Sequence, residues 1–370
     1  MFDGYRRRQQ FSFRSSFSIG LAVCLIRQTR TRLTQQPLDG APVDVTVLCR
    51  SHLTTVEILD LRHFSSADLR SLLEEEVETW RNLLCWDYRS SAEMILRYVD
   101  AKILPGYAAV ERGSIVGFSF FVYEGSKGVV GDLFVSPRRG DGRQIESQML
   151  EHMIETLQSS PGIRRVEAQL LTHPTGELAS AFASSGFQRY HPLFLGLHLR
   201  GKDAPQMPPV RLPQEIQTRR WMEQDYQPAA GVITAAYRAH IDSEINDQYR
   251  TNAGSIRFLN NIVRFPGCGV FDVESSYVAI HRPTHALVGL ILCSRVKDDV
   301  GHVTQVCLVP EYRHQGIGEN LIACTYNSLR SRNFNLLSLT VTEMNGRAVD
   351  LYKRLGFVQM SVFDAFVWEG

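Results

Sequence analysis

The residue pattern with the clearest chemical meaning is a glycine-containing loop that joins a predicted strand to a predicted helix. It reads Arg313-His314-Gln315-Gly316-Ile317-Gly318, and Pro310 ends the strand before it. A glycine has no Cβ, so a ligand can approach the backbone closely. The first amides of the following helix are free to donate hydrogen bonds, and the helix dipole makes that end positive. The loop therefore predicts a binding site for a diphosphate group.

Two other phosphate-binding loops do not fit this segment. A P-loop would continue with Lys and then Ser or Thr after its last glycine, but Glu319 follows Gly318. A dinucleotide-binding fingerprint would open a β-α-β unit, whereas this loop follows a predicted meander of strands at 277–281, 286–296 and 301–309. Taken alone, the two glycines are also consistent with a strand-to-helix turn that binds no ligand.

A second pattern follows the next predicted strand, residues 336–341. Together the two patterns resemble the motifs of the GNAT superfamily of N-acetyltransferases, and the resemblance covers residues 210–370. The first pattern resembles the acetyl-CoA pyrophosphate loop at Leu308, Pro310, Tyr312, Arg313, Gly316, Ile317 and Gly318. The second resembles the family's later motif at Asn345, Ala348, Leu351, Tyr352, Gly356 and Phe357. The resemblance implies transfer of an acetyl group from acetyl-CoA to a primary amine in a ternary complex.

The resemblance also implies which residues bind acetyl-CoA, and it implies no metal. The expected binding residues are Leu308, Arg313, His314, Gln315, Gly316, Ile317, Gly318, Glu319 and Asn345. In this interpretation the loop amides hold the diphosphate, Arg313 is a candidate charge partner, and the amide of Leu308 donates to the thioester carbonyl. Asn345 could instead cap its own helix.

Three residues are candidates for proton transfer. The resemblance places Tyr352 where the family protonates the CoA thiolate, although a tyrosine there could also simply pack on the sheet. An amine with a pKa near 10.4 is neutral in only about one part in 10³ at pH 7, so a base is needed. His302 matches the position of a catalytic Glu in some family members, and an ordinary histidine pKa suits a base. Glu343 is the second candidate for the base, and a strand histidine could also be structural.

The rest of the chain predicts two halves with the same order of elements. Each half reads as a strand, two helices, three strands, a helix, a strand, a helix and two strands. The predicted helices are 67–84, 92–102, 143–158 and 177–184 in the first half, and 227–240, 254–264, 318–330 and 345–355 in the second. This order predicts an α/β (α+β) fold with mixed sheets, arranged as two tandem GNAT-like domains.

The predicted domains are divided by a proline-rich seam. Residues 1–50 form a basic extension that we expect to be disordered, 51–200 a degenerate GNAT-like domain, 201–214 a linker, and 215–370 the catalytic domain. In the first half Phe182 replaces the motif tyrosine, Asp141 lies inside the loop, and Val129 falls where His302 falls. We therefore expect chemistry only in the second half. This division resembles tandem GNAT proteins such as mycothiol synthase, in which one half is active.

Composition narrows the choice of partners. The formal charge of +1 gives no support to nucleic acid or a membrane surface as the main partner. The apolar run at 17–26 is too short to span a bilayer. The 7 cysteines show no paired metal-ligand spacing, so we expect reduced thiols in a cytoplasmic protein. The expected acceptor is a small-molecule or peptide amine, and the protein a monomer or homodimer. The alternative function is a non-catalytic acyl-CoA-binding or regulatory protein.

Overall fold

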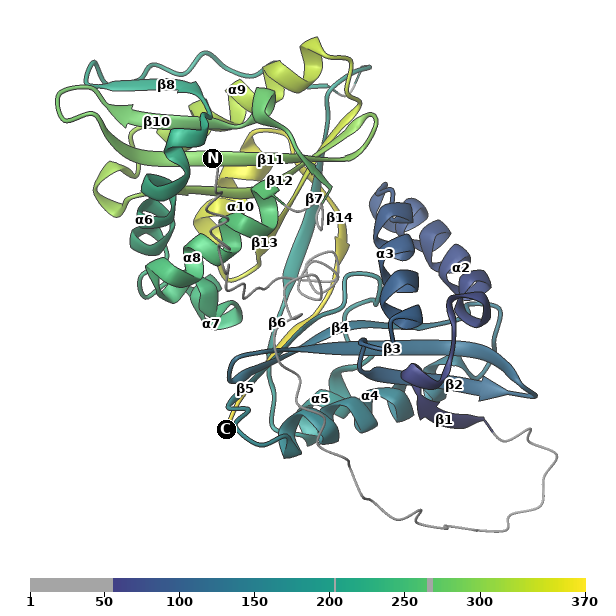
Figure 1. Cartoon of the computed structure of the whole chain (residues 1–370). Coiled ribbons are helices and arrows are strands. Elements are labelled where there is room, and N and C mark those ends of the chain that lie inside the picture. The colour runs from purple at the N-terminus through teal and green to yellow at the C-terminus, as the bar shows by residue number, and fades with distance from the viewer. Residues whose placement is uncertain (1–55, 203, 265–268) are drawn as a thin grey trace, which may run out of the picture.

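The computed structural model describes residues 56–202, 204–264 and 269–370 as two mixed α/β halves (Figure 1). The predicted extension at 1–50 and its apolar run lie outside these residues. Within them, no helix is long and apolar enough to cross a membrane, and no group of side chains could hold a metal ion. The described cysteines, Cys85, Cys293, Cys307 and Cys324, are free thiols. The predicted fold class is confirmed.

The first half follows the predicted order of elements. Its strands are β1 (Glu57–Asp60), β2 (Gly106–Glu111), β3 (Ser114–Glu124), β4 (Lys127–Val135), β5 (Arg165–Gln169), β6 (Gln188–Tyr190) and β7 (Pro192–His198). Its helices are α2 (Ser66–Leu84), α3 (Arg89–Asp100), α4 (Gly142–Ser159) and α5 (Ala179–Ser184). Helix α2 shows which features of the sequence allowed a helix to be predicted. Ser65 and Asp68 form a capping box at its start, and leucines at helical spacing face the core.

The second half has the same plan with extra short elements. Its strands are β8 (Ile216–Arg220), β9 (Val270–Phe271), β10 (Tyr277–His281), β11 (Ala286–Lys297), β12 (Val300–Leu308), β13 (Leu336–Thr342), β14 (Val358–Val362) and β15 (Ala365–Glu369). Its helices are α6 (Tyr226–Ala236), α7 (Ile241–Ile245), the 3₁₀ turn η3 (Asp247–Arg250), α8 (Asn252–Leu259), the π-turn η4 (Asn260–Arg264), α9 (Ile317–Ser331) and α10 (Gly346–Arg354).

The segment between α6 and α8 differs from the prediction of one helix to residue 240. Three successive side chains each accept a hydrogen bond from a backbone amide and start a new turn: His240 before α7, Asn246 before η3 and Thr251 before α8. Such caps compete with a continuous helix. The chain therefore turns back on itself here. Helix α7 packs against β15, and Asp242 reaches Thr342 at the end of β13.

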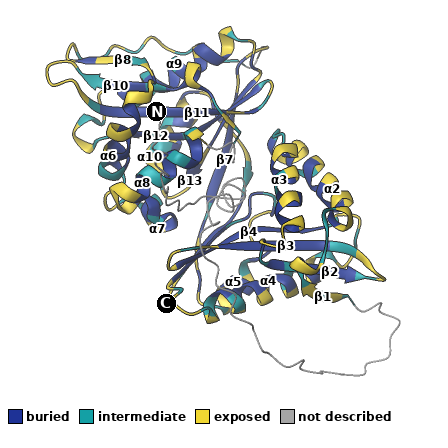
Figure 2. Ribbon diagram, viewed as in Figure 1, coloured by how far each residue is buried: buried dark blue, intermediate teal, exposed yellow. Residues whose placement is uncertain are grey.

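The last strands of the two halves are exchanged, which the sequence analysis does not predict. The first sheet has the order β1-β2-β3-β4-β5-β15-β6, and the second has β14-β7-β13-β12-β11-β10-β8 with β9 beside β11. Thus β7 lies between β13 and β14, and β15 lies between β5 and β6, as Figure 1 shows. Strand β7 is buried along nearly its whole length (Figure 2). The seam at 201–214 therefore does not separate the two sheets.

The exchange makes the stability of the first half depend on the end of the chain. Phe366 of β15 is 2% exposed and stacks on Phe182 with 3.9 Å between ring centroids. We expect Phe366→Ala to destabilise the protein by about 3–5 kcal/mol, because truncating a buried Phe leaves a cavity. Chemical denaturation measures this. The control is Val358→Ala, at a side chain 54% exposed on β14, with an expected change within about 0.5 kcal/mol. Equal effects of the two changes would contradict this packing.

Candidate functional site

A cavity of about 1140 Å³ opens where β12 and β13 separate. The two strands pair in parallel only from Val300–Leu336 to Val303–Leu339. Beyond that point β12 stays paired with β11 as far as Leu308, while its other edge borders the cavity. First-half residues also line the cavity, among them Trp86 and Gln169. The site therefore has an open strand edge, which can offer backbone hydrogen bonds to an elongated ligand.

One end of the cavity is the start of α9. Gly316 is the N-cap residue with φ +77°, a conformation that favours glycine. A Cβ on Gly318 would meet only Leu308 Cδ1, at 3.7 Å, so the backbone here is open to the cavity. The positive end of a helix of 15 residues faces this space. The geometry fits a diphosphate.

Eight of the nine residues predicted to bind acetyl-CoA line the cavity. Those that line the cavity are Leu308, Arg313, His314, Gly316, Ile317, Gly318, Glu319 and Asn345. Gln315 is not among the lining residues, and its side chain donates to the carbonyl of Glu311. The side chain of Asn345 makes no capping bond to α10, although a cap was one of its two expected roles.

Arg313, the expected charge partner, donates to the carbonyl of Ala236 at 2.6 Å and so fixes the loop to the end of α6.

Two further arginines near α9 were given no role by the sequence analysis. Arg347 and Arg354 of α10 line the cavity, and Arg354 pairs with Glu319 at 3.3 Å. These arginines are seven positions apart, about two helical turns, so they share one face of the helix. That spacing is the signal that could have identified them.

Tyr352 lines the same cavity. It is buried on α10, and its ring makes an edge contact with Phe357 at 5.6 Å between centroids. Burial raises the pKa of its phenol above the ordinary value, and nearby Asp242 and Cys307 add to the rise. The phenol is therefore protonated at neutral pH and carries a proton that it can donate.

Asp242 is the functional candidate that the sequence analysis missed. No pattern in the sequence linked this residue to the glycine-containing loop or to Tyr352. In the structure it lines the cavity and accepts a hydrogen bond from Thr342 Oγ1 at 2.5 Å. Burial raises the pKa of its carboxyl, opposed by the bond from Thr342 and by His240. A carboxylate with a raised pKa is a better proton acceptor than an ordinary one.

His302 and Glu343 lie in surroundings that do not favour a base. His302 lines the cavity but its ring packs against both Trp86 and Phe194, and its Nδ1 lies 2.9 Å from Ser338 Oγ. Burial lowers the pKa of its imidazole to about 3. Glu343 is exposed and does not line the cavity. A histidine with so low a pKa holds a proton poorly at neutral pH.

The environment of His302 predicts a particular pH dependence. Its pKa is depressed in the folded protein, so the unfolded chain binds this proton more tightly. The contribution of neutral His302 to the free energy of unfolding is therefore present above pH 6.5 and is lost as the pH falls toward 3. Below pH 6.5, wild-type stability should fall more steeply than that of His302→Gln, as denaturation at several pH values measures. The kcat/KM profiles of the two proteins should have the same inflections between pH 5 and 9. An inflection near pH 6.5 lost in the variant would support a base role for His302.

The first-half loop is occupied by its own side chains. Arg139 binds Asp141 at 2.7 Å and Glu111 at 2.9 Å, and Asp141 is the residue before α4. A carboxylate thus occupies the N-cap position, which is Gly316 in the second half. Phe182, which replaces the tyrosine, is fully buried. These contacts do not favour a diphosphate at α4.

Residues 243–357 match the model of the Acetyltransferase (GNAT) family. The mycothiol acetyltransferase of Thermobifida fusca (strain YX) is 27% identical over 294 residues, which cover 73% of this chain and 81% of that protein.

Two solved structures have a similar fold over most of the chain. A GCN5-related N-acetyltransferase from Sphaerobacter thermophilus has a TM-score of 0.54 and 17% identity, covering 79% of this chain and 91% of its own. A tandem GNAT protein from the clavulanic acid biosynthesis pathway has a TM-score of 0.51 and 16% identity, covering 85% and 98%. At these identities the likeness shows the fold, that of two GNAT-like domains in tandem.

Proposed function

We propose that the second half, whose residues 243–357 match the Acetyltransferase (GNAT) family model, transfers the acetyl group of acetyl-CoA directly to a primary amine. The observation that carries the proposal is one continuous cavity. It joins the start of α9 to Tyr352 and Asp242. A diphosphate site, an open strand edge, a proton donor and a proton acceptor therefore border the same space.

Acetyl-CoA fits this cavity in chemical terms. The amides at Gly316–Glu319 would hold the diphosphate, with Arg347 as an added cation, and the free edge of β12 would bind the pantetheine arm. In the reaction the amine nitrogen forms a bond to the acetyl carbon as the carbon–sulfur bond breaks. Tyr352 gives its proton to the leaving sulfur, so that CoA departs as the free thiol. The nitrogen then loses its second proton as the amide forms, and this proton restores the phenol of Tyr352.

The amine must lose a proton before it attacks. At pH 7 an amine with a pKa near 10.4 is mostly charged, and forming the neutral amine that can attack costs roughly 4 kcal/mol. We assign the acceptance of this proton to Asp242 rather than to His302 or Glu343. Its carboxylate lines the cavity and also attracts a cationic amine, whereas His302 is a poor base and Glu343 lies outside the cavity. The acceptor is a small molecule or a peptide that carries the amine.

Release of free CoA thiol from acetyl-CoA tests the proposal. The panel of acceptors contains spermidine, kanamycin and a peptide with a free amino terminus. We expect at least one amine to increase thiol release above hydrolysis, with an equal amount of acetylated amine found by mass spectrometry. Tight binding of acetyl-CoA without thiol release across the panel would instead support a non-catalytic acyl-CoA-binding protein.

A further inference from the structure

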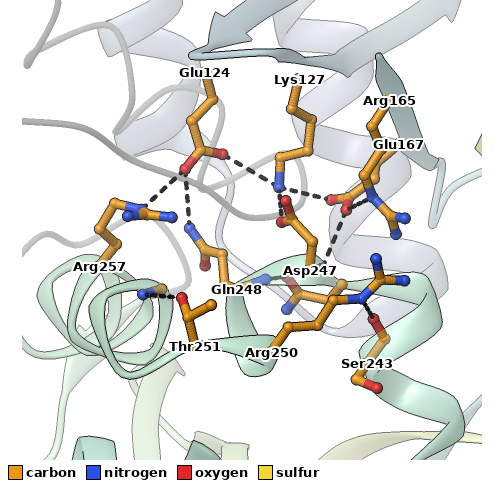
Figure 3. Close-up of polar contacts among 12 residues, drawn as sticks. Glu124, Lys127, Arg165, Glu167, Ser243, Asp247, Gln248, Arg250, Thr251 and Arg257 are labelled. Atoms are coloured by element: carbon orange, nitrogen blue, oxygen red, sulfur yellow. Dashed lines mark hydrogen bonds and ion pairs between the residues drawn. The ribbon is translucent and has the colours of Figure 1, made fainter. Parts of the chain in front are cut away.

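A cluster of buried charges joins the two halves beside the cavity. Its first-half members are Glu124 at the end of β3, Lys127 at the start of β4, and Arg165 and Glu167 on β5. Its second-half members are Asp247, Gln248 and Arg257 (Figure 3). We call these seven residues the junction cluster. From it we propose that Lys127 is a positioning residue for acetyl transfer, which holds one wall of the second-half cavity in place from the first half. This inference rests on the proposed function.

Lys127 is the centre of the cluster. It is 3% exposed, and its Nζ lies 2.6 Å from Asp247, 3.0 Å from Glu167 and 3.2 Å from Glu124. Burial alone would lower the pKa of the amine, but the three carboxylates outweigh burial and raise it. Lys127 is therefore charged at neutral pH, and it connects two first-half carboxylates to one from the second half.

Further contacts fix the same second-half segment. The amide of Asp247 donates to Glu167 Oε1 at 3.3 Å, and Arg165 donates to the carbonyl of Glu244. Gln248 is fully buried and donates to Glu124 at 3.5 Å. Figure 3 shows these side chains meeting from opposite sides, with the first-half strands above and η3 below. Both α7 and η3 are thus held by first-half groups.

The same short segment forms a wall of the cavity. The lining residues Asp242, Ile245, Asn246 and Tyr249 alternate along the chain with the anchored positions 244, 247 and 248. One side of the segment therefore faces the cavity, and the other side faces the junction cluster. Helices of 5 and 4 residues have little stability of their own. The position of Asp242 consequently depends on contacts with the first half.

Loss of the lysine charge would loosen this wall. Without Lys127, the carboxylates of Glu124, Glu167 and Asp247 would face one another with less compensation, and uncompensated buried charge is strongly unfavourable. Asp247, whose side chain is 31% exposed, is the member best able to move toward water. Its movement would displace the neighbouring wall residues, whereas the start of α9 lies elsewhere on the cavity. The kcat/KM for the amine should therefore fall, whereas the affinity for acetyl-CoA should not change.

The test uses the full chain with Lys127→Met and the milder Asp247→Asn, which keeps the shape of the side chain. Lys127→Arg keeps the charge and should restore part of the function. The matched control is Glu93→Gln, which removes an exposed ion pair with Arg70 between α2 and α3. Three quantities are measured: amide hydrogen exchange of residues 241–250 and 310–320, acetyl-CoA affinity by calorimetry, and kcat and KM for the panel amine that is acetylated fastest.

We expect faster exchange at 241–250 but not at 310–320 in Lys127→Met and Asp247→Asn. Acetyl-CoA affinity should stay within about 2-fold, while kcat/KM for the amine should fall about 10²-fold in Lys127→Met, as is typical of a misplaced site. Unchanged exchange at 241–250 in the folded variants would overturn the inference. So would altered exchange with an unchanged kcat/KM, or an equal loss of acetyl-CoA affinity. If the wild type acetylates no amine, the proposed function fails, and hydrogen exchange alone then decides whether Lys127 holds the wall.

Discussion

Gly318→Asp is expected to weaken acetyl-CoA binding about 10²-fold or more while the fold stays intact. Two charges 4 Å apart interact by about 4 kcal/mol at an effective dielectric constant near 20, and about 1.4 kcal/mol corresponds to a factor of ten. The new carboxylate would lie in the first turn of α9, beside the site proposed for the diphosphate. An acidic residue in that turn normally stabilises a helix. Weaker binding in calorimetry would therefore not reflect loss of α9.

Two controls separate charge from shape and one half from the other. Gly318→Ala adds a Cβ without charge and should change the affinity much less, because that Cβ has room. Gly142→Asp places the same carboxylate in the first turn of α4 and should leave the affinity unchanged. Gly316 is a less clear test because its φ of +77° would strain any side chain. Equal weakening by Gly142→Asp and Gly318→Asp would mean that the binding site is not at α9.

Tyr352→Phe is expected to lower the rate of the chemical step by about 10²- to 10⁴-fold, the usual contribution of a general acid. The ring would keep its contact with Phe357, so acetyl-CoA affinity should change little. Rapid-quench kinetics measure the chemical step even when product release limits turnover.

The matched control is Tyr326→Phe. Tyr326 is another buried tyrosine of the second half, and its hydroxyl donates to the carbonyl of Pro205 at 2.6 Å. It does not line the cavity. Loss of this hydroxyl should cost about 1 kcal/mol of stability and leave the chemical step unchanged. A chemical step that is as fast in Tyr352→Phe as in the control would leave Tyr352 with a packing role only.

The parts of the site that sequence could predict are local. The loop at 313–318 lies between one strand and one helix, so its glycines and Pro310 were enough to indicate its shape. The helix of Tyr352 has a clear period, and its later Gly-Phe ending fixed its place in the motif. The order of elements in each half was predictable for the same reason, because hydrophobic period and turn residues act over short distances.

The parts that sequence could not predict depend on distant contacts. Strands β7 and β15 have equivalent places in the two sheets, so their patterns do not show which sheet each one joins. The low pKa of His302 comes from burial against Trp86 and Phe194, both in the first half of the sequence. Asp242 reaches the cavity after the His240 cap, which ends the path of α6 and starts α7. Each of these features required the folded chain.

A crystal structure of the full chain with acetyl-CoA tests the assignment of catalysis to the second half most directly. The predicted result is a diphosphate against the first turn of α9, with the pantetheine arm along the free edge of β12 and the thioester near Tyr352. Acetyl-CoA bound at a second place as well would not change this result. A cofactor bound only in the first half, beside Asp141 at the start of α4, would contradict the assignment.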